Sequence, residues 1–174
     1  NERIGYYLWY ENGQMESEST YVQRNRDGKR TKWYKNGQKK QEQIYKSKDL
    51  KQDLIKTKIT SWYENGQKKA KGNIYIIQGF EEMYGKWTEW YENGQKKKEG
   101  NIKNSYRVGR WTFWYESGQK KEEGTYKDGK VDGLYSSWYD NGQKMEEVLT
   151  KDGKPVGKRK IYNKDGSLKE VIEY

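Results

Sequence analysis

Trp90-Tyr91-Glu92-Asn93-Gly94-Gln95-Lys96-Lys97 is an octapeptide that recurs in near-copies along this 174-residue chain. The copies share an aromatic pair, one further residue and then Asn-Gly or a close equivalent, and their glycines are Gly13, Gly37, Gly66, Gly94, Gly118, Gly142 and Gly166. Successive glycines are therefore 24, 29, 28, 24, 24 and 24 residues apart. A period in the twenties is typical of a stacked repeat architecture.

Each copy carries the sequence signal of a β-hairpin. Asn-Gly between two strand-like runs favours a type I′ turn, which needs φ > 0 at both central residues. Folding the chain about Ser117-Gly118 places Trp111 opposite Gly124 and Gly109 opposite Tyr126. We expect the Trp111 ring to cover the bare backbone of Gly124, because a large side chain across the ladder can shield the hydrogen bonds beside a glycine.

Alternation along the first strand of each hairpin predicts two aromatic rows on opposite faces. Tyr115 points to one face, whereas Trp114, which is expected opposite Lys121, points to the other. In the last copy Ile161 replaces Trp and one residue is added before the glycine. The predicted Tyr row is Tyr10, Tyr34, Tyr63, Tyr91, Tyr115, Tyr139 and Tyr162, and the predicted Trp row is Trp9, Trp33, Trp62, Trp90, Trp114 and Trp138.

Composition argues against a closed core of the ordinary kind. Ile, Leu, Val and Phe make up about 14% of the residues, below the roughly 20% that usually indicates disorder, and mean hydropathy is −1.48. Yet aromatic residues reach 16%, and they stand at fixed positions of the repeat. We therefore predict an all-β protein: an elongated, twisted, single-layer antiparallel sheet of about seven consecutive hairpins, forming one repeat domain over residues 1–174.

Two connections between hairpins are longer than the others. They cover residues 46–58 and 76–84, and we expect the bulges of the sheet there because the glycine spacing is disturbed only at these points. Insertions in repeat proteins often gather on the binding face. A plain insertion is the favoured interpretation of both, although the second carries the apolar residues Phe80 and Met83.

Three segments carry a resemblance to a known family. They are Glu-Gly-Thr-Tyr-Lys at 123–127, Asp-Gly-Lys-Val-Asp-Gly at 128–133 and Trp-Tyr-Asp-Asn-Gly-Gln-Lys at 138–144. The pattern resembles the bacterial MORN-repeat-variant family and extends over nearly the whole chain. The resemblance implies consecutive hairpins in one sheet and an interaction scaffold. Some members of the family are labelled antitoxin or immunity proteins, others look like exported surface proteins, and the family carries no catalytic or binding residue over to this chain.

Catalysis is not favoured by the sequence. The chain has neither His nor Cys, which removes imidazole and thiol chemistry and the usual zinc ligands. Its acidic residues recur at the repeat period, as on a solvated face, and no phosphate-binding loop or nucleophile motif is present. We predict a protein that is not an enzyme and that uses no cofactor and no metal.

Three classes of binding partner remain. A protein partner is favoured, held by exposed aromatic residues: Trp62, Trp90, Trp114, Trp138, Phe80 and Met83. A toxin bound by an antitoxin or immunity protein is one form of this. The alternative is an anionic membrane surface or another polyanion. This alternative is supported by the formal charge of +10 and by a predicted ladder of lysines, which are Lys68, Lys69, Lys96, Lys97, Lys120 and Lys121. Acidic neighbours such as Glu116 dilute that ladder, and nucleic acid is the least favoured partner because Arg is scarce.

Compartment and self-association are predicted from weaker signals. The absence of Cys and of an initiator Met favours an exported or cell-surface protein, with a cytoplasmic protein as the alternative. An open sheet exposes unpaired strands at its ends, so edge-to-edge homodimerisation is predicted through the first hairpin or the segment 171–174. Glu170 and Glu173 oppose indiscriminate pairing at the second of these ends.

Overall fold

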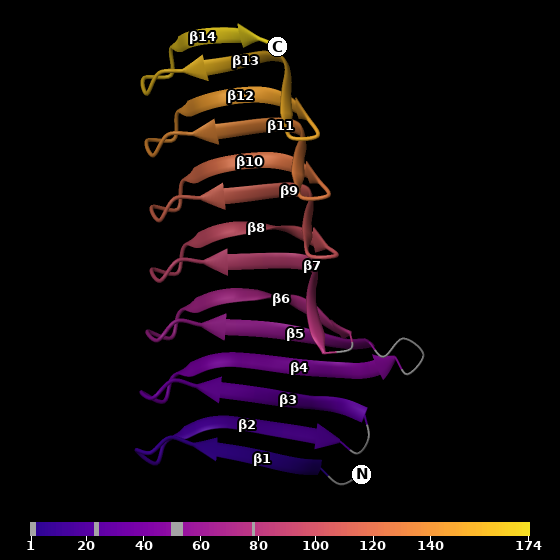
Figure 1. The fold of residues 1–174 in the computed structure, drawn as a ribbon. Helices are drawn as coiled ribbons and strands as arrows, with labels where there is room; N and C mark the ends of the chain where they lie inside the picture. Colours follow the sequence, from indigo (N-terminus) through magenta and orange to yellow (C-terminus); the bar gives the residue numbers. More distant parts are fainter. Residues whose placement is uncertain (1–2, 23–24, 50–53, 78) are drawn as a thin grey trace. The chain divides into compact units, whose positions relative to one another are not determined.

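The computed structural model describes residues 3–22, 25–49, 54–77 and 79–174, and its regular elements there are strands (Figure 1). None of these described residues forms a helix long and apolar enough to cross a membrane. The strands are β1 (Arg3–Trp9), β2 (Met15–Val22), β3 (Asn25–Trp33), β4 (Lys39–Asp49), β5 (Leu54–Trp62), β6 (Lys68–Ile77), β7 (Phe80–Trp90), β8 (Lys96–Lys103), β9 (Tyr106–Trp114), β10 (Lys120–Lys127), β11 (Lys130–Trp138), β12 (Lys144–Lys151), β13 (Lys154–Tyr162) and β14 (Leu168–Glu173).

Strand order follows the chain, from β1 to β7 and from β8 to β14, and neighbouring strands are antiparallel. The predicted all-β class, with consecutive antiparallel hairpins, is confirmed. The chain divides into two compact units, Asn1–Gly94 with β1 to β7 and Gln95–Tyr174 with β8 to β14. The assignment of residues 1–174 to a single repeat domain stays a prediction.

The Asn-Gly turns lie where the sequence predicts them but are of another type. In the fifth hairpin Gly118 N donates to Tyr115 O over 2.9 Å and Tyr115 N donates to Gln119 O over 2.8 Å. Gly118 has φ 86°, whereas the residue before it is not among those with positive φ. This is the pattern of a type I turn followed by a glycine bulge. The predicted type I′ turn is therefore wrong at these positions.

The extra turn residue shifts the register at one point only. Trp114 lies opposite Lys120, so the predicted pair with Lys121 is wrong. Beyond the bulge the predicted register returns, because Trp111 lies opposite Gly124 as expected. Type I′ turns occur at the other end of the strands instead, where Asp128 has φ 49° and Gly129 has φ 83°.

A second bulge recurs between successive hairpins, and it decides which ring covers which glycine. Between β8 and β9 the register passes from Glu99 opposite Thr112 to Asn101 opposite Val108, so Gly100 faces three residues. Gly109, at φ 66°, makes this possible. Equivalent glycines with positive φ are Gly85, Gly133 and Gly157. Bulges thus recur at these four glycines as well as in the first long connection, where the register shifts between Lys46 and Lys48, so the expectation that they mark only the two long connections is wrong.

The glycine at this second bulge is covered by the ring of the following hairpin. A Cβ on Gly100 would lie 2.3 Å from Trp111 Cδ2, and a Cβ on Gly72 would lie 2.0 Å from Trp87 Cε3. A Cβ on Gly124 would lie 3.3 Å from Tyr135 Cδ2, so the ring above this glycine is that of Tyr135. Aromatic cover of glycine is therefore present, but the prediction that Trp111 covers Gly124 is wrong.

The hydrophobic core is thin and is distributed along the strands, as the low content of aliphatic residues requires. In the second unit Trp111 is 1% exposed, and its Nε1 donates to Asn101 O over 2.8 Å. The Arg107 guanidinium lies 5.1 Å from the Trp111 ring and 5.5 Å from the Tyr126 ring. In the first unit Ile55 and Ile74 are buried. Burial is thus distributed repeat by repeat.

The two stretches expected as long connections are mostly strand. In the first, Lys46 lies opposite Lys56 and Asp49 opposite Leu54; residues 50–53 lie outside the described residues. In the second, Ile77 lies opposite Phe80 and Ile74 opposite Met83, and residue 78 lies outside the described residues. The additional residues therefore lengthen β4, β6 and β7 and make longer hairpins.

Candidate binding face

Within each unit the Tyr row joins one hairpin to the next. The Tyr115 hydroxyl donates to Trp138 O over 2.8 Å, and the Tyr139 hydroxyl donates to Tyr162 O over 2.9 Å. The same bond links Tyr10 to Trp33, Tyr34 to Trp62 and Tyr63 to Trp90. A partly buried hydroxyl used in this way stabilises the stack, and its proton is already donated within the chain. The Tyr row is therefore structural.

Tyr162 does not belong to this row. It lies opposite Leu168, as Trp138 lies opposite Lys144, and Asn163 takes the turn position of Tyr139. The seventh copy therefore contains no added residue. The prediction that placed Tyr162 in the Tyr row is wrong, because it aligned the residue type and the structure aligns the turn.

The turn residues form a second ladder between hairpins. Asn65 Nδ2 donates to Glu92 O over 2.9 Å, and Asn141 Nδ2 donates to Lys164 O over 2.7 Å. The Gln95 Oε1 lies 2.9 Å from the place where a Cβ on Gly118 would stand. The Asn, Gly and Gln of the octapeptide thus hold the repeats together.

The Trp row lies on the other face, which we call the Trp face. Its rings are half-buried at Trp33, Trp62, Trp90, Trp114 and Trp138. A lysine of the preceding hairpin reaches over the ring: Lys120 Nζ is 5.0 Å from the Trp138 centroid, and Lys96 Nζ is 5.5 Å from the Trp114 centroid. Such cation–π contacts order the lysine and leave part of each indole in contact with solvent.

Each of these lysines is also paired with a glutamate three residues further on. Lys120 Nζ lies 2.8 Å from Glu123 Oε2, Lys96 Nζ lies 3.3 Å from Glu99 Oε2, and Lys144 is paired with Glu147. The sequence predicted an acidic neighbour at Glu116, but the partner is Glu123. The signal that could have found these acids is the Lys-x-x-Glu spacing after each Gly-Gln, seen also at Lys39 and Glu42.

Among these glutamates of the second unit, Glu123 is contacted by two basic side chains. Arg110 Nη2 lies 2.6 Å from its Oε1, opposite the Lys120 contact. Burial raises the pKa of Glu123, but the hydrogen bonds from Lys120 and Arg110 outweigh this and hold the pKa below its ordinary value. The carboxylate therefore neutralises much of the local positive charge on the Trp face.

The predicted lysine ladder is divided between the two faces. Lys69 Nζ lies 5.3 Å from the Tyr63 ring and Lys121 Nζ lies 5.7 Å from the Tyr115 ring, on the side of the Tyr row. Lys96 and Lys120 belong to the Trp face, and Lys68 lies opposite Trp62. Lys97 is exposed in β8. These six residues do not form one continuous cationic stripe.

Phe80 and Met83 are not brought to the tryptophans. Phe80 is the first residue of β7 and is 76% exposed, whereas Trp90 is its last residue. Met83 is 37% exposed and lies opposite Ile74, on the side of the buried residues. The structure therefore separates the predicted aromatic and apolar contacts into two places.

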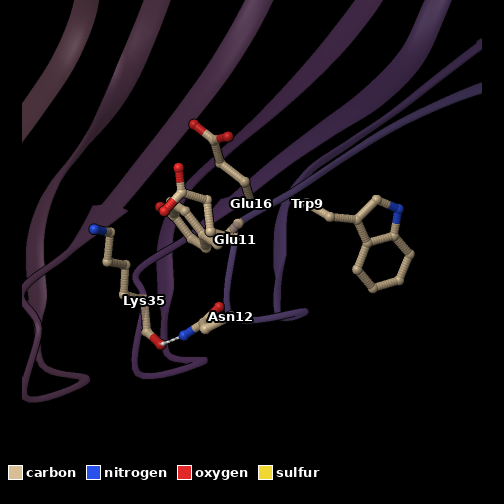
Figure 2. Close-up of a pocket in the computed structure, with 6 residues that line it drawn as sticks. Trp9, Glu11, Asn12, Glu16 and Lys35 are labelled. Carbon is tan, nitrogen blue, oxygen red and sulfur yellow. Dashed lines mark hydrogen bonds between the residues drawn. The ribbon is translucent and has the colours of Figure 1, made fainter.

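A pocket of about 450 Å³ opens at the first Asn-Gly turn, lined by Trp9, Tyr10, Glu11, Asn12, Glu16 and Lys35. Figure 2 shows Trp9 pointing away from Glu11, Glu16 and Lys35, and Asn12 Nδ2 donating to Lys35 O over 3.5 Å. Lys35 Nζ lies 6.0 Å from the Tyr10 ring. In the part of the chain that the structure describes, no group of three or more acidic, His or Cys side chains is placed to hold a metal ion.

Comparison with known proteins gives one family. The family model described as MORN repeat variant matches residues 6–23, 26–47, 83–104, 107–128 and 131–152, more than half of the chain. No curated protein matches. Among solved structures, the chain is similar to a protein with unknown function from Bacteroides fragilis, with 11% identity over 99% of this chain and 92% of that chain and a TM-score of 0.15.

Proposed function

Because this chain belongs to the MORN repeat variant family, whose repeats suggest a binding scaffold, we propose that it holds a partner protein on its Trp face. The support comes from one repeated unit: a half-buried Trp, a lysine over its ring and a glutamate paired with that lysine. In the second unit these are Trp114 with Lys96 and Trp138 with Lys120. Half-exposed indoles inside a polar rim are typical of interface hot spots.

The division of labour between the faces supports the same choice. The hydroxyls of the Tyr row form hydrogen bonds between hairpins, for example from Tyr115 to Trp138 O. The indoles of Trp114 and Trp138 are half-buried, each with a lysine over its ring. Half-exposed aromatic surface of this kind is surface that a partner can bury.

A polyanion partner is less well supported. Ladder lysines on the Trp face are paired with acids, as at Lys120 and Glu123, and others lie over tyrosines on the opposite face, as at Lys121. A polyanion would have to compete with these acids at every step of the ladder. MORN repeat proteins are generally not enzymes, and an antitoxin or immunity protein would be one case of the proposed scaffold.

The experiment is affinity capture from a lysate of the organism that makes the chain. The parent is compared with Trp114→Ala and Trp138→Ala, and Phe80→Ala serves as the matched control because Phe80 is an exposed aromatic at the opposite end of β7 from Trp90. Each variant must first melt near the parent. We expect either Trp variant to lose the captured protein while Phe80→Ala keeps it. Capture that survives both Trp variants, or that Phe80→Ala abolishes, would exclude the Trp face as the binding surface.

A further inference from the structure

A pocket of about 290 Å³ lies in the interior of the first unit, on the side of the Tyr row. Its floor is a pair of small residues on neighbouring strands, Ser61 of β5 and Ala70 of β6, which lie directly opposite each other and are partly exposed. In the fifth hairpin the same two positions of the repeat hold Phe113 and Glu122, again opposite each other. The third hairpin therefore leaves open a place that the fifth hairpin fills with large side chains. We call it the Ser61–Ala70 pocket.

Two aromatic side chains wall this pocket, and each is held by a hydrogen bond. Tyr34 comes from β3 and Trp87 from β7, on either side of the floor strands. The Tyr34 hydroxyl donates to Trp62 O over 2.9 Å. Trp87 Nε1 donates to Glu89 Oε1 over 3.0 Å, which engages the carboxylate that lies opposite Ala70. Fixed rings beside a floor of small residues suit a flat apolar group of one or two rings.

The charged residues that line the pocket in the described chain are two lysines, and no acid is among them. Lys40 Nζ lies 5.5 Å from the Tyr34 ring, and Lys69 Nζ lies 5.3 Å from the Tyr63 ring. Unlike Lys120 on the Trp face, neither of them forms an ion pair with a carboxylate among the residues that the structure describes. Two ammonium groups without an acidic partner, at the mouth of an aromatic pocket, favour an anionic ligand.

We propose that the Ser61–Ala70 pocket binds a small aromatic carboxylic acid as its anion. The ring of the ligand lies on the two small residues between the two aromatic walls, and its carboxylate lies between Lys40 and Lys69. Equivalent residues of adjacent hairpins are about 9.6 Å apart, twice the strand spacing, so both flexible lysines can reach one carboxylate. The volume commits the pocket to a free acid of one or two rings. The site lies on the side opposite the Trp face and leaves that face open to a partner protein.

Binding of 4-fluorophenylacetate tests the proposal, followed by fluorine NMR and by the indole N–H resonances of the protein. We expect a dissociation constant of about 1 mM or tighter. The ligand should shift the indole resonance of Trp87, assigned with Trp87→Phe, and should not shift that of Trp111, which occupies the same position in the fifth hairpin. The neutral analogue 4-fluorophenylacetamide should bind about fivefold more weakly or worse, because it cannot pair with the two ammonium groups.

Variants with a matched control separate this pocket from general attraction to lysine. Ser61→Phe introduces the side chain that the fifth hairpin carries at this place, so it should fill the pocket and abolish binding while the protein melts near the parent. Lys40→Gln combined with Lys69→Gln should weaken binding by about tenfold. The control is Lys121→Gln, which removes the equivalent of Lys69 from the fifth hairpin and should leave the affinity unchanged.

Several results would overturn the proposal. They are absence of binding at about 10 mM ligand, equal affinity for the acid and the amide, full affinity in Ser61→Phe, and an equal loss of affinity in Lys121→Gln. The acetylated tripeptide Gly-Gly-Phe carries the same ring and carboxylate at the end of a peptide, and tighter binding of this peptide than of the free acid would also refute a small-acid site. These measurements involve neither Trp114 nor Trp138, so their outcome is independent of the partner protein proposed above.

Discussion

Replacing Gly100 by Ala is the sharpest test of how the hairpins pack. The new Cβ would lie 2.3 Å from Trp111 Cδ2, 2.4 Å from Cε2 and 2.5 Å from Cγ, so the body of the indole must move. Trp111 is 1% exposed and its Nε1 is bonded to Asn101 O at 2.8 Å. Because the contact involves the root of the ring, a small rotation cannot relieve it.

The cost follows from three terms. Overpacking of a filled site costs about 1–3 kcal/mol, and the displaced indole gives up a hydrogen bond worth about 1 kcal/mol. Alanine in a strand recovers about 0.5–1 kcal/mol relative to glycine. We expect Gly100→Ala to lower the free energy of unfolding by about 1–3.5 kcal/mol. Gly124→Ala is the matched control, since its Cβ would lie 3.3 Å from Tyr135 Cδ2, and its net effect should stay within about 1 kcal/mol.

Urea unfolding followed by tryptophan fluorescence measures both changes. A Trp111→Ala background makes the test specific, because Gly100→Ala should cost much less there if the two residues are in contact. The packing described for β8 and β9 would be refuted by a Gly100→Ala protein as stable as the parent. It would also be refuted if Gly124→Ala proved equally costly.

Three further outcomes are expected. Tyr115→Phe should cost about 1 kcal/mol, seen as a fall in melting temperature of about 2–4 °C, because it removes the bond to Trp138 O. Gly109→Ala should cost about 1–2 kcal/mol in urea unfolding, and Gly109→Asn less, since φ is 66° and the cost comes from the backbone alone. Glu123 has a pKa below its ordinary 4.5 in the folded state, so its stabilising contribution is present above that pH and is lost on acidification. Glu123→Gln should therefore lose less stability than the parent between about pH 5 and about pH 3, and an identical loss would contradict the ion pairs at this residue.

The sequence was sufficient for the strands and for the place of the turns, but not for the turn type. Asn-Gly occurs both in a type I′ turn and in a type I turn with a glycine bulge, and the glycine has a left-handed backbone conformation in both. The two differ in the residue before the glycine, and here Asn141 uses its side chain to bond Gln143 N and Lys164 O. These bonds reach into the turn and into the next hairpin, and no local pattern reveals the second of them.

The site was predicted less completely for a related reason. The alternation of side chains correctly placed Trp114 and Tyr115 on different faces. Which lysine contacts which ring depends on the bulge, and as a result Lys120 lies over Trp138 whereas Lys121 lies over Tyr115 on the other face. The cover of Gly100 by Trp111 could not be predicted because it crosses to the preceding hairpin through the bulge at Gly109. The sequence periodicity specifies the repeat, whereas contacts between repeats depend on the exact register.

The measurement that tests the proposed function most directly is the dissociation constant of the captured protein at two salt concentrations. We expect Trp114→Ala to weaken binding by about 30-fold or more, corresponding to roughly 2 kcal/mol, and a tenfold rise in salt to change the parent's affinity by less than about threefold. Neutralising both Lys97 and Lys121, which do not reach over the Trp114 and Trp138 rings, serves as the control and should leave binding nearly unchanged. Binding that survives Trp114→Ala but collapses with salt and with the lysine changes would contradict a protein partner on the Trp face.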